Sequence, residues 1–312
     1  MSDNRSYLPS TPNAPPAIVD SITAERLQDA MRSAYAPHTV RAYGAAWRAW
    51  SEWAAAHAAQ ALPADPEAVG LYLADRERQG AGMATLRMAA AAITAAHRAA
   101  GHDTPCTAPP VVLALRGFAR DAAEAGHAPR QAKPLTAEAV MAIRVHLRGK
   151  VNRSHRAARD MALVSVMSDA GLRRSEAAAL RWSDIAAEPD GSGRVTIRRS
   201  KTDQEGEGAT VAITPAAMQD LELLERLAGS APERRVFPVS DRTIGRRIAA
   251  LAAGAELAPG YSGHSGRVGM AMRMTRNGAP AAAVMRQGRW KTVEMVARYT
   301  RNEAAGEALK YL

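Results

Sequence analysis

The sequence predicts a mainly α-helical protein with one small antiparallel β-sheet. Three observations support this fold class. Apolar residues recur at helical spacing along most of the chain, and one pair of short segments alternates apolar with polar residues. The predicted helices also fall into two groups, separated by a proline-containing segment. At 312 residues the chain is long enough for about two domains, each with a core of its own.

The amino terminus is not expected to fold. Residues 1–20 carry Pro9, Pro12, Pro15 and Pro16 among small and polar neighbours, without apolar periodicity. This composition is typical of a disordered arm. We therefore predict a disordered arm at 1–20, a helical first domain at 21–126, an extended linker at 127–134 and a second domain at 135–312.

The first domain is predicted to be a bundle of four or five helices. Asp65-Pro66-Glu67 combines an N-cap, a proline at the first helical position and a first-turn acid, so a helix should run from there to about Arg78. Other helices are expected at 83–100 and 110–125. The first helix, 39–57, has an apolar stripe formed by Val40, Tyr43, Trp47, Trp50 and Trp53.

The second domain should begin at Leu135-Thr136, with Thr136 as an N-cap and Leu135 in contact with Val140 as a hydrophobic staple. The alternating segments 194–198 and 210–214 predict a β-hairpin, the one β structure that we expect. Further helices are predicted at 160–170, 173–182, 241–253, 267–276, 281–287, 293–298 and 303–311.

Composition narrows the class of partner. Lysine and arginine number 41 against 31 acidic residues, a formal charge of +10, so the long-range field favours polyanions such as DNA.

The single cysteine, Cys106, excludes an intramolecular disulfide. The polar first residues do not form a secretory signal, and no apolar run approaches the length of a membrane span. We expect a cytoplasmic, DNA-associated protein.

Several basic residues are suited to cleaving a phosphodiester without a metal. The charge on the phosphate oxygens grows during displacement, and arginine meets it with two parallel hydrogen bonds. Arg173 and Arg267 are the predicted phosphate ligands, and Glu176, three residues after Arg173, can fix its guanidinium. His264, three residues before Arg267, can donate a hydrogen bond or accept the nucleophile's proton.

The reaction also needs a general acid and a nucleophile. Lys201, at the predicted hairpin turn, can protonate the leaving 5′ oxygen, although its acidic neighbours suit a DNA backbone poorly. A covalent ester to a side chain is required, because the sequence has no nucleotide-binding loop or metal cluster, and no cofactor is expected. Five of the seven tyrosines lie on core-like helix stripes, before or beside the first bundle, or almost at the carboxyl terminus. Tyr261 and Tyr299 are therefore the candidate nucleophiles. We prefer Tyr299, predicted at the end of a helix, because Trp290 can pack against that helix and donate its indole N–H to phosphate.

Together these segments resemble the tyrosine recombinase (phage integrase) family, and its Cre-type branch most closely. The resemblance covers roughly residues 20–312 and rests on five motifs: His38-Thr39-Val40-Arg41, Gly171 to Glu176, the hairpin lysine of Ser200-Lys201-Thr202, Gly263 to Gly269, and Trp290 to Asn302. Two departures stand out. Val268 replaces a second histidine of many relatives, and Arg289 intrudes between Gly288 and Trp290.

The resemblance implies a site-specific recombinase. Tyr299 would form a 3′-phosphotyrosine and release a 5′-hydroxyl, and four protomers on two inverted-repeat sites of double-stranded DNA would exchange strands through a Holliday junction. The residues implied as catalytic are Arg173, Lys201, His264, Arg267, Trp290 and Tyr299, with Glu176 in support. Candidate DNA contacts are Arg41, Arg87, Met88 and Arg116 in the first domain and Arg242 and Arg246 in the second.

The predicted tail helix at 303–311, with apolar Ala305, Leu309, Tyr311 and Leu312 in and after it, should dock into a neighbouring protomer of this homotetramer. Two alternatives stay open. A monomeric type IB-like topoisomerase would share the nucleophile and arginines but relax supercoils without a partner site. A non-catalytic DNA-binding protein could retain the fold without the reaction.

Overall fold

The computed structural model describes residues 37–126, 131–198 and 208–308, and the chain divides into two compact units between Pro129 and Arg130. The predicted disordered arm and residues 127–130 of the predicted linker lie outside the described residues. Within the described ranges, no helix is both long and apolar enough to cross a membrane.

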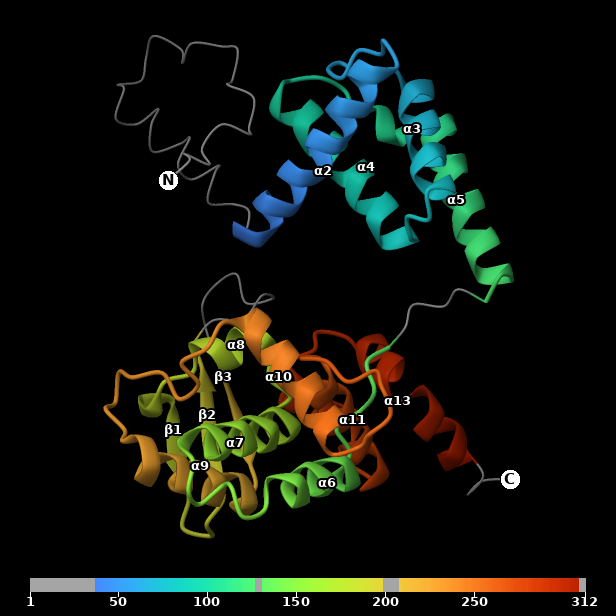
Figure 1. Ribbon diagram of the computed structural model, residues 1–312. Coiled ribbons are helices and arrows are strands. Elements are labelled where there is room, and N and C mark those ends of the chain that lie inside the picture. Colours follow the sequence, from blue (N-terminus) through green and yellow to red (C-terminus); the bar gives the residue numbers. More distant parts are fainter. Residues whose placement is uncertain (1–36, 127–130, 199–207, 309–312) are drawn as a thin grey trace, which may run out of the picture. The chain divides into compact units, whose positions relative to one another are not determined.

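The described part of the first unit, residues 37–126, is all-helical, as predicted (Figure 1). Asp65 caps one helix by accepting a hydrogen bond from the Glu67 amide at 2.6 Å, and a proline follows the cap as the first helical residue. The helices end within a few residues of the predicted bounds: α2 (Pro37–Ala56), α3 (Pro66–Arg78), α4 (Met83–Ala99), the 3₁₀ turn η1 (Pro105–Thr107) and α5 (Pro109–Glu124).

The core of the first unit gathers around the aromatic stripe of α2. Trp50 is fully buried, its ring lies 5.3 Å from that of Tyr72, and its indole N–H donates to the Ala61 carbonyl at 3.1 Å. The stripe does not face the core along its whole length, because Trp47 and Trp53 are only partly buried and Val40 is 36% exposed. Trp50 is therefore the residue of this stripe that is fully buried in the core.

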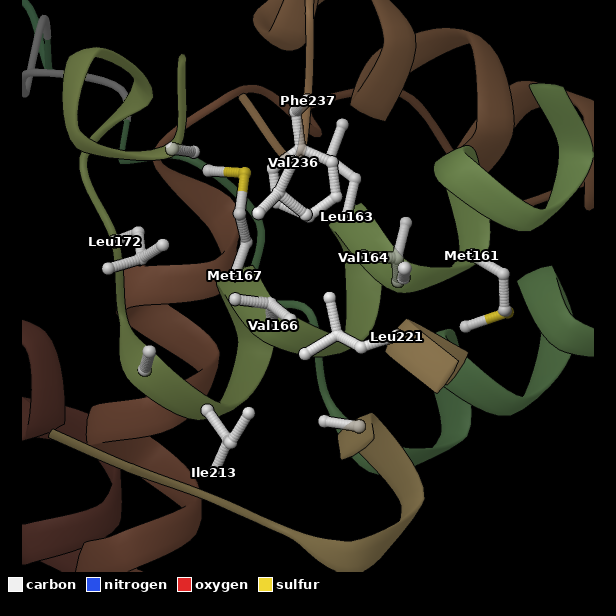
Figure 2. Close-up of a cluster of buried hydrophobic side chains, with 14 of the residues drawn as sticks. Met161, Leu163, Val164, Val166, Met167, Leu172, Ile213, Leu221, Val236 and Phe237 are labelled. Atoms are coloured by element: carbon white, nitrogen blue, oxygen red, sulfur yellow. The ribbon is translucent and has the colours of Figure 1, made fainter. Parts of the chain in front are cut away.

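The second unit is built around one buried helix, α7 (His155–Ala170), which contacts helices on several sides and strand β3 (Figure 1). Figure 2 shows Leu163, Val166 and Met167 of this helix among apolar side chains from other elements. The helix begins earlier than predicted, after Ser154, whose hydroxyl accepts from the Ala157 amide. The other helices are α6 (Ala137–Leu147), α8 (Arg174–Ala179), α9 (Pro215–Ala228), α10 (Asp241–Gly254), α11 (Ser265–Arg276), α12 (Ala281–Gly288) and α13 (Val293–Ala308).

The sheet has three antiparallel strands in the order β1-β2-β3 rather than the predicted hairpin alone. The strands are β1 (Ile185–Ala187), β2 (Gly193–Ile197) and β3 (Ala209–Ile213). Val195 pairs with Ile185 on one side and Val211 on the other. The predicted hairpin is confirmed, and the alternation buries Val195 and Val211. Strand β1 was missed because three residues carry too little periodicity to detect.

Three other helix predictions are wrong. The expected helices 293–298 and 303–311 are one helix, α13, so Tyr299 lies inside a helix rather than at its end. No proline or glycine stands between residues 298 and 303 to stop it. Helix α8 is shorter than the predicted 173–182, because the chain leaves it at Leu180 and forms the 3₁₀ turn η2 (Trp182–Asp184). Helix α9 was not predicted.

Helix α11 lies unusually close to neighbouring backbone. A Cβ added at Gly266 would come within 2.4 Å of the Met167 carbonyl oxygen on α7, and one at Gly269 within 2.1 Å of the Leu135 carbonyl oxygen. Real side chains do not approach backbone so closely, so both positions require glycine. The close packing brings Arg267, between the two glycines, to the carboxyl end of α7.

Candidate active site

The turn after α7 positions Arg173 and Glu176. Helix α7 ends at Gly171, in the left-handed conformation at φ +55°, and Arg173 then caps α8. The buried Glu176 carboxylate accepts from both the Arg173 amide and its guanidinium Nη1, each at 2.8 Å. Burial alone would raise the pKa of Glu176, but the nearby Arg289 and the hydrogen bonds from Arg173 outweigh it and lower this pKa. Glu176 is therefore an ionised carboxylate.

The guanidinium of Arg267 lies against the same turn. Its side chain is 1% exposed, Nη1 donates to the Gly171 carbonyl at 2.9 Å, and Nη2 donates to the Gly288 carbonyl. The guanidinium carbon also lies 4.6 Å from the centre of the Trp290 ring. Burial, then repulsion from Arg173 and Arg289, lowers the pKa of Arg267 to about 9. An anion beside it would relieve that repulsion.

Tyr299 of α13 meets His264 at the start of α11. The His264 Nε2 and Tyr299 Oη atoms are 2.8 Å apart, a hydrogen-bond distance. The Tyr299 ring stacks on Trp290, with centres 5.1 Å apart and planes inclined by 24°. The buried Trp290 Nε1 has no hydrogen-bond partner among the described residues, so this N–H can donate to a ligand oxygen.

The protonation state of His264 follows from its surroundings. Its ring keeps contact with solvent, yet the protein removes part of its hydration, and this desolvation is the main cause of a lowered pKa. Positive charge on Arg267, Arg173, Arg174 and Arg298 lowers the pKa further. His264 is therefore neutral near pH 7 and can accept a proton from the phenol.

The sequence model of the phage integrase family matches residues 134–305, more than half of the chain. The chain belongs to the phage integrase family. It is 25% identical over 323 residues to the recombinase Cre of Escherichia phage P1, and the match covers 93% of both chains.

Solved structures show the same fold. A lambda integrase dimer bound to a core site matches with a TM-score of 0.60 at 18% identity, over 88% of this chain and 93% of that one. The XerH recombinase bound to its difH substrate matches with a TM-score of 0.58 at 15% identity, over 78% of this chain and 71% of that one. The mainly helical fold with a small sheet is therefore that of this family's members.

The structure brings together five of the predicted catalytic residues, Arg173, His264, Arg267, Trp290 and Tyr299, and Glu176 is bound to Arg173. Lys201 lies in 199–207, outside the described residues. The competing nucleophile Tyr261 packs against the main core of the second unit, and burial raises the pKa of its phenol. The raised pKa disfavours Tyr261 as a nucleophile, whereas the Tyr299 oxygen lies within hydrogen-bond distance of the neutral His264.

The predicted DNA contacts all lie on exposed helical surface. Arg242 and Arg246 are one turn apart on α10, so they share a face of that helix. The four candidates of the first unit are exposed as well: Arg41 on α2, Arg87 and Met88 on α4, and Arg116 on α5. Their part in DNA binding stays a prediction.

Sequence reasoning missed the role of one residue. Arg289 was noted only as a departure from the family pattern, yet its guanidinium Nη2 donates to the Glu176 carboxylate at 2.9 Å. Its side chain is 6% exposed. No local sequence signal predicts this contact, because residues 176 and 289 are far apart in the chain. The structure thus adds a third arginine to the site.

Proposed function

We propose that this protein is a site-specific DNA recombinase that cleaves and rejoins DNA through a 3′-phosphotyrosine at Tyr299. The observation that carries the proposal is the hydrogen-bond distance between Tyr299 and the neutral His264, beside the Arg173 and Arg267 guanidiniums. Membership in the phage integrase family supports it, as does the similarity to recombinase Cre along nearly the whole chain.

The geometry suggests how each group acts. Arg173 and Arg267 bind the non-bridging oxygens of the scissile phosphate, and the Trp290 indole donates to one of them. As the Tyr299 oxygen attacks phosphorus, His264 takes the phenolic proton. The bond from phosphorus to the 5′ oxygen breaks, and Lys201 supplies the proton to this leaving oxygen. Cleavage leaves the phosphate esterified to Tyr299 and a free 5′-hydroxyl.

Rejoining is the reverse displacement with a different nucleophile. The 5′-hydroxyl of a partner duplex attacks the phosphotyrosine and releases Tyr299, so the energy of the bond is conserved without a cofactor. In our proposal four protomers on two inverted-repeat sites exchange strands in pairs through a Holliday junction. The domain at 21–126, joined by 127–134 to that at 135–312, would contribute Arg41, Arg87, Met88 and Arg116, and α10 would contribute Arg242 and Arg246.

The carboxyl-terminal segment is proposed to dock in a neighbouring protomer in trans. Helix α13 runs unbroken from Val293 to Ala308, so the segment continues the helix that carries Tyr299. Docking would therefore act on the position of the nucleophile as well as on assembly. The bound protein would be found with DNA in the cytoplasm.

Two experiments test the function in sequence. Selection of bound fragments from a random DNA pool first supplies a target site. A duplex of that site, nicked just 3′ of the scissile phosphate, then loses a short 5′-hydroxyl fragment on cleavage and traps the adduct. We expect a covalent complex whose modified peptide contains Tyr299. Absence of an adduct would leave only the DNA-binding alternative, and relaxation of supercoils without exchange between two sites would favour the topoisomerase.

A further inference from the structure

Arg289 stands where the backbone is unusual for a residue with a side chain. It caps the carboxyl end of α12 in the left-handed conformation, at φ +54° and ψ +48°. Side chains rarely adopt this conformation, because Cβ crowds the following backbone, and glycine occupies it most easily. An arginine held here indicates that its side chain makes compensating contacts.

The buried guanidinium of Arg289 donates four hydrogen bonds to neighbouring segments of the second unit. Nη1 donates to the carbonyls of Ala170 at 3.1 Å and Gln287 at 3.0 Å. Nη2 donates to the Gly171 carbonyl at 3.0 Å and to the Glu176 carboxylate at 2.9 Å. The guanidinium therefore ties the end of α12 to the turn between α7 and α8.

Two of these acceptors also hold the predicted phosphate ligands. Glu176 accepts from Arg173 through its other carboxylate oxygen at 2.8 Å, and the Gly171 carbonyl accepts from Arg267 at 2.9 Å. Arg289 is thus bound between the anchor of Arg173 and the anchor of Arg267. Removing it would loosen both anchors at once.

Charge gives a second reason for the residue. Arg173, Arg267 and Arg289 surround one carboxylate, Glu176, so these four side chains carry two positive charges in excess. A phosphodiester has one negative charge, and more develops on its equatorial oxygens during the displacement. With Glu176 paired to Arg173 alone, only Arg267 would stay uncompensated. Arg289 offsets the carboxylate, so the positive charge of Arg173 remains available to phosphate.

We infer that Arg289 is a positioning residue of the phosphate site, which holds Arg173 and Arg267 through shared acceptors and supplies a third positive charge near the scissile phosphate. The inference rests on the proposed function. Burial chiefly, and repulsion from Arg173, lower the pKa of Arg289, although its ion pair with Glu176 opposes that change. A phosphate in the site would offset this repulsion between arginines. Because the phosphate oxygens gain negative charge during the displacement, the transition state is stabilised more than the bound substrate, and the barrier to cleavage falls.

The test compares two variants that both lose the planar fork but differ in charge. Arg289→Asn is neutral, and asparagine tolerates the left-handed conformation better than most residues. Arg289→Lys keeps the positive charge. Arg144→Gln is the matched control, because it breaks a different ion pair of the second unit, with Asp220 at 2.6 Å. Each variant receives the nicked duplex with either a normal scissile phosphate or an uncharged methylphosphonate, and the rate of adduct formation is measured per DNA-binding-competent molecule.

On the normal phosphate we expect Arg289→Asn to lose about tenfold to hundredfold in rate, the range typical of residues that orient the groups in direct contact with the reacting centre. Arg289→Lys should lose much less, and Arg144→Gln should match the unaltered chain. On the methylphosphonate the loss of Arg289→Asn should shrink, because no charge is left to stabilise. Both rates of a given variant scale with its fraction of folded protein, so this fraction cancels when the two rates are divided. A variant that folds poorly can therefore still be compared between the two substrates.

Equal losses for Asn and Lys on the normal phosphate, or no loss for either, would overturn the inference. So would an equal loss of Arg289→Asn on both substrates, which would mark a purely structural residue. Where the unaltered chain leaves the methylphosphonate intact, the comparison of Asn with Lys on phosphate decides. Absence of an adduct from the unaltered chain would overturn the proposed function itself, whereas an adduct unaffected by Arg289→Asn overturns this inference alone.

Discussion

The Nε2 atom of His264 lies 2.8 Å from the hydroxyl oxygen of Tyr299, and both residues belong to one chain. The proposed base and nucleophile thus meet without DNA and without a second protomer. Trp290 stacks on the Tyr299 ring and also lies against the Arg267 guanidinium, so one indole contacts both the proposed nucleophile and a proposed phosphate ligand. This arrangement predicts that each protomer attacks the phosphate that its own arginines bind.

Replacing Tyr299 by phenylalanine removes one oxygen and keeps the ring that stacks on Trp290. We expect Tyr299→Phe to bind its site with unchanged affinity and to form no covalent complex with the nicked duplex. Loss of the hydrogen bond to His264 should cost about 1 kcal/mol of stability at most. Gel-shift and adduct assays on the same preparation check both points, and a persisting adduct would assign the nucleophile to another tyrosine.

The pH dependence of cleavage follows from the lowered pKa of His264. The neutral, proton-accepting form is present above this pKa and is lost as pH falls through it, so the rate should fall on acidification below about pH 6.5, the ordinary histidine value. Adduct formation at limiting DNA reports the pKa of the free protein. A rate that does not fall on acidification down to the pH at which the protein unfolds would contradict the role of His264 as base.

Among the described residues, Glu176 is the carboxylate that lies between the three arginines of this site, and its side chain is 2% exposed. Glu176→Gln keeps its shape but leaves buried guanidiniums without a counter-charge, which typically costs about 3 to 5 kcal/mol. We expect the free energy of unfolding to fall by that order and to recover in part when DNA supplies phosphates. Denaturant titrations with and without the target duplex measure the difference; equal stability losses in both would show that phosphate does not replace the carboxylate.

The site was more predictable from sequence than its supporting contacts were. Arg173 and Glu176 are three residues apart, as are His264 and Arg267, so each of these candidate pairs is local in the sequence. Contacts between distant segments leave no such trace. The Arg289 bond to Glu176 depends on a left-handed backbone at residue 289 and on tight packing of α11, and both are properties of the folded chain.

The fold shows the same division. Helices with clear caps, such as α3 after Asp65 and α6 after Thr136, begin where the sequence predicts. Helix α9 was nevertheless missed, although Thr214 caps it and Pro215 is its first residue. Other errors occur where local signals are weak: strand β1 has only three residues, and α13 has no cap between its predicted halves. There the tertiary packing, rather than local propensity, decides which residues are helical or extended.

The carboxyl-terminal segment can be tested by two truncations. Deleting 303–312 removes the last turns of α13 as well as the apolar tail, whereas deleting 309–312 removes only Leu309, Lys310, Tyr311 and Leu312. If docking in trans drives assembly, both chains should bind DNA and form some adduct, yet lose strand exchange between two sites. Recombination assays and size measurements of the DNA complexes distinguish these steps. Undiminished recombination by the longer deletion would count against docking.

The close approach of α11 to neighbouring backbone predicts a strong effect of one added methyl group. In Gly266→Ala the new Cβ would meet the Met167 carbonyl oxygen at 2.4 Å, so α11 must shift and carry Arg267 and His264 with it. We expect a loss of about 1 to 3 kcal/mol in stability of the second unit and a slower cleavage reaction. Gly117→Ala is the control, because nothing lies within 4 Å of its added Cβ, and there alanine should stabilise α5 by about 0.5 to 1 kcal/mol. Amide hydrogen exchange measures protection segment by segment, so it reports the stability of each unit separately. Similar protection in α11 of Gly266→Ala and the unaltered chain would mean that the helix does not depend on this contact.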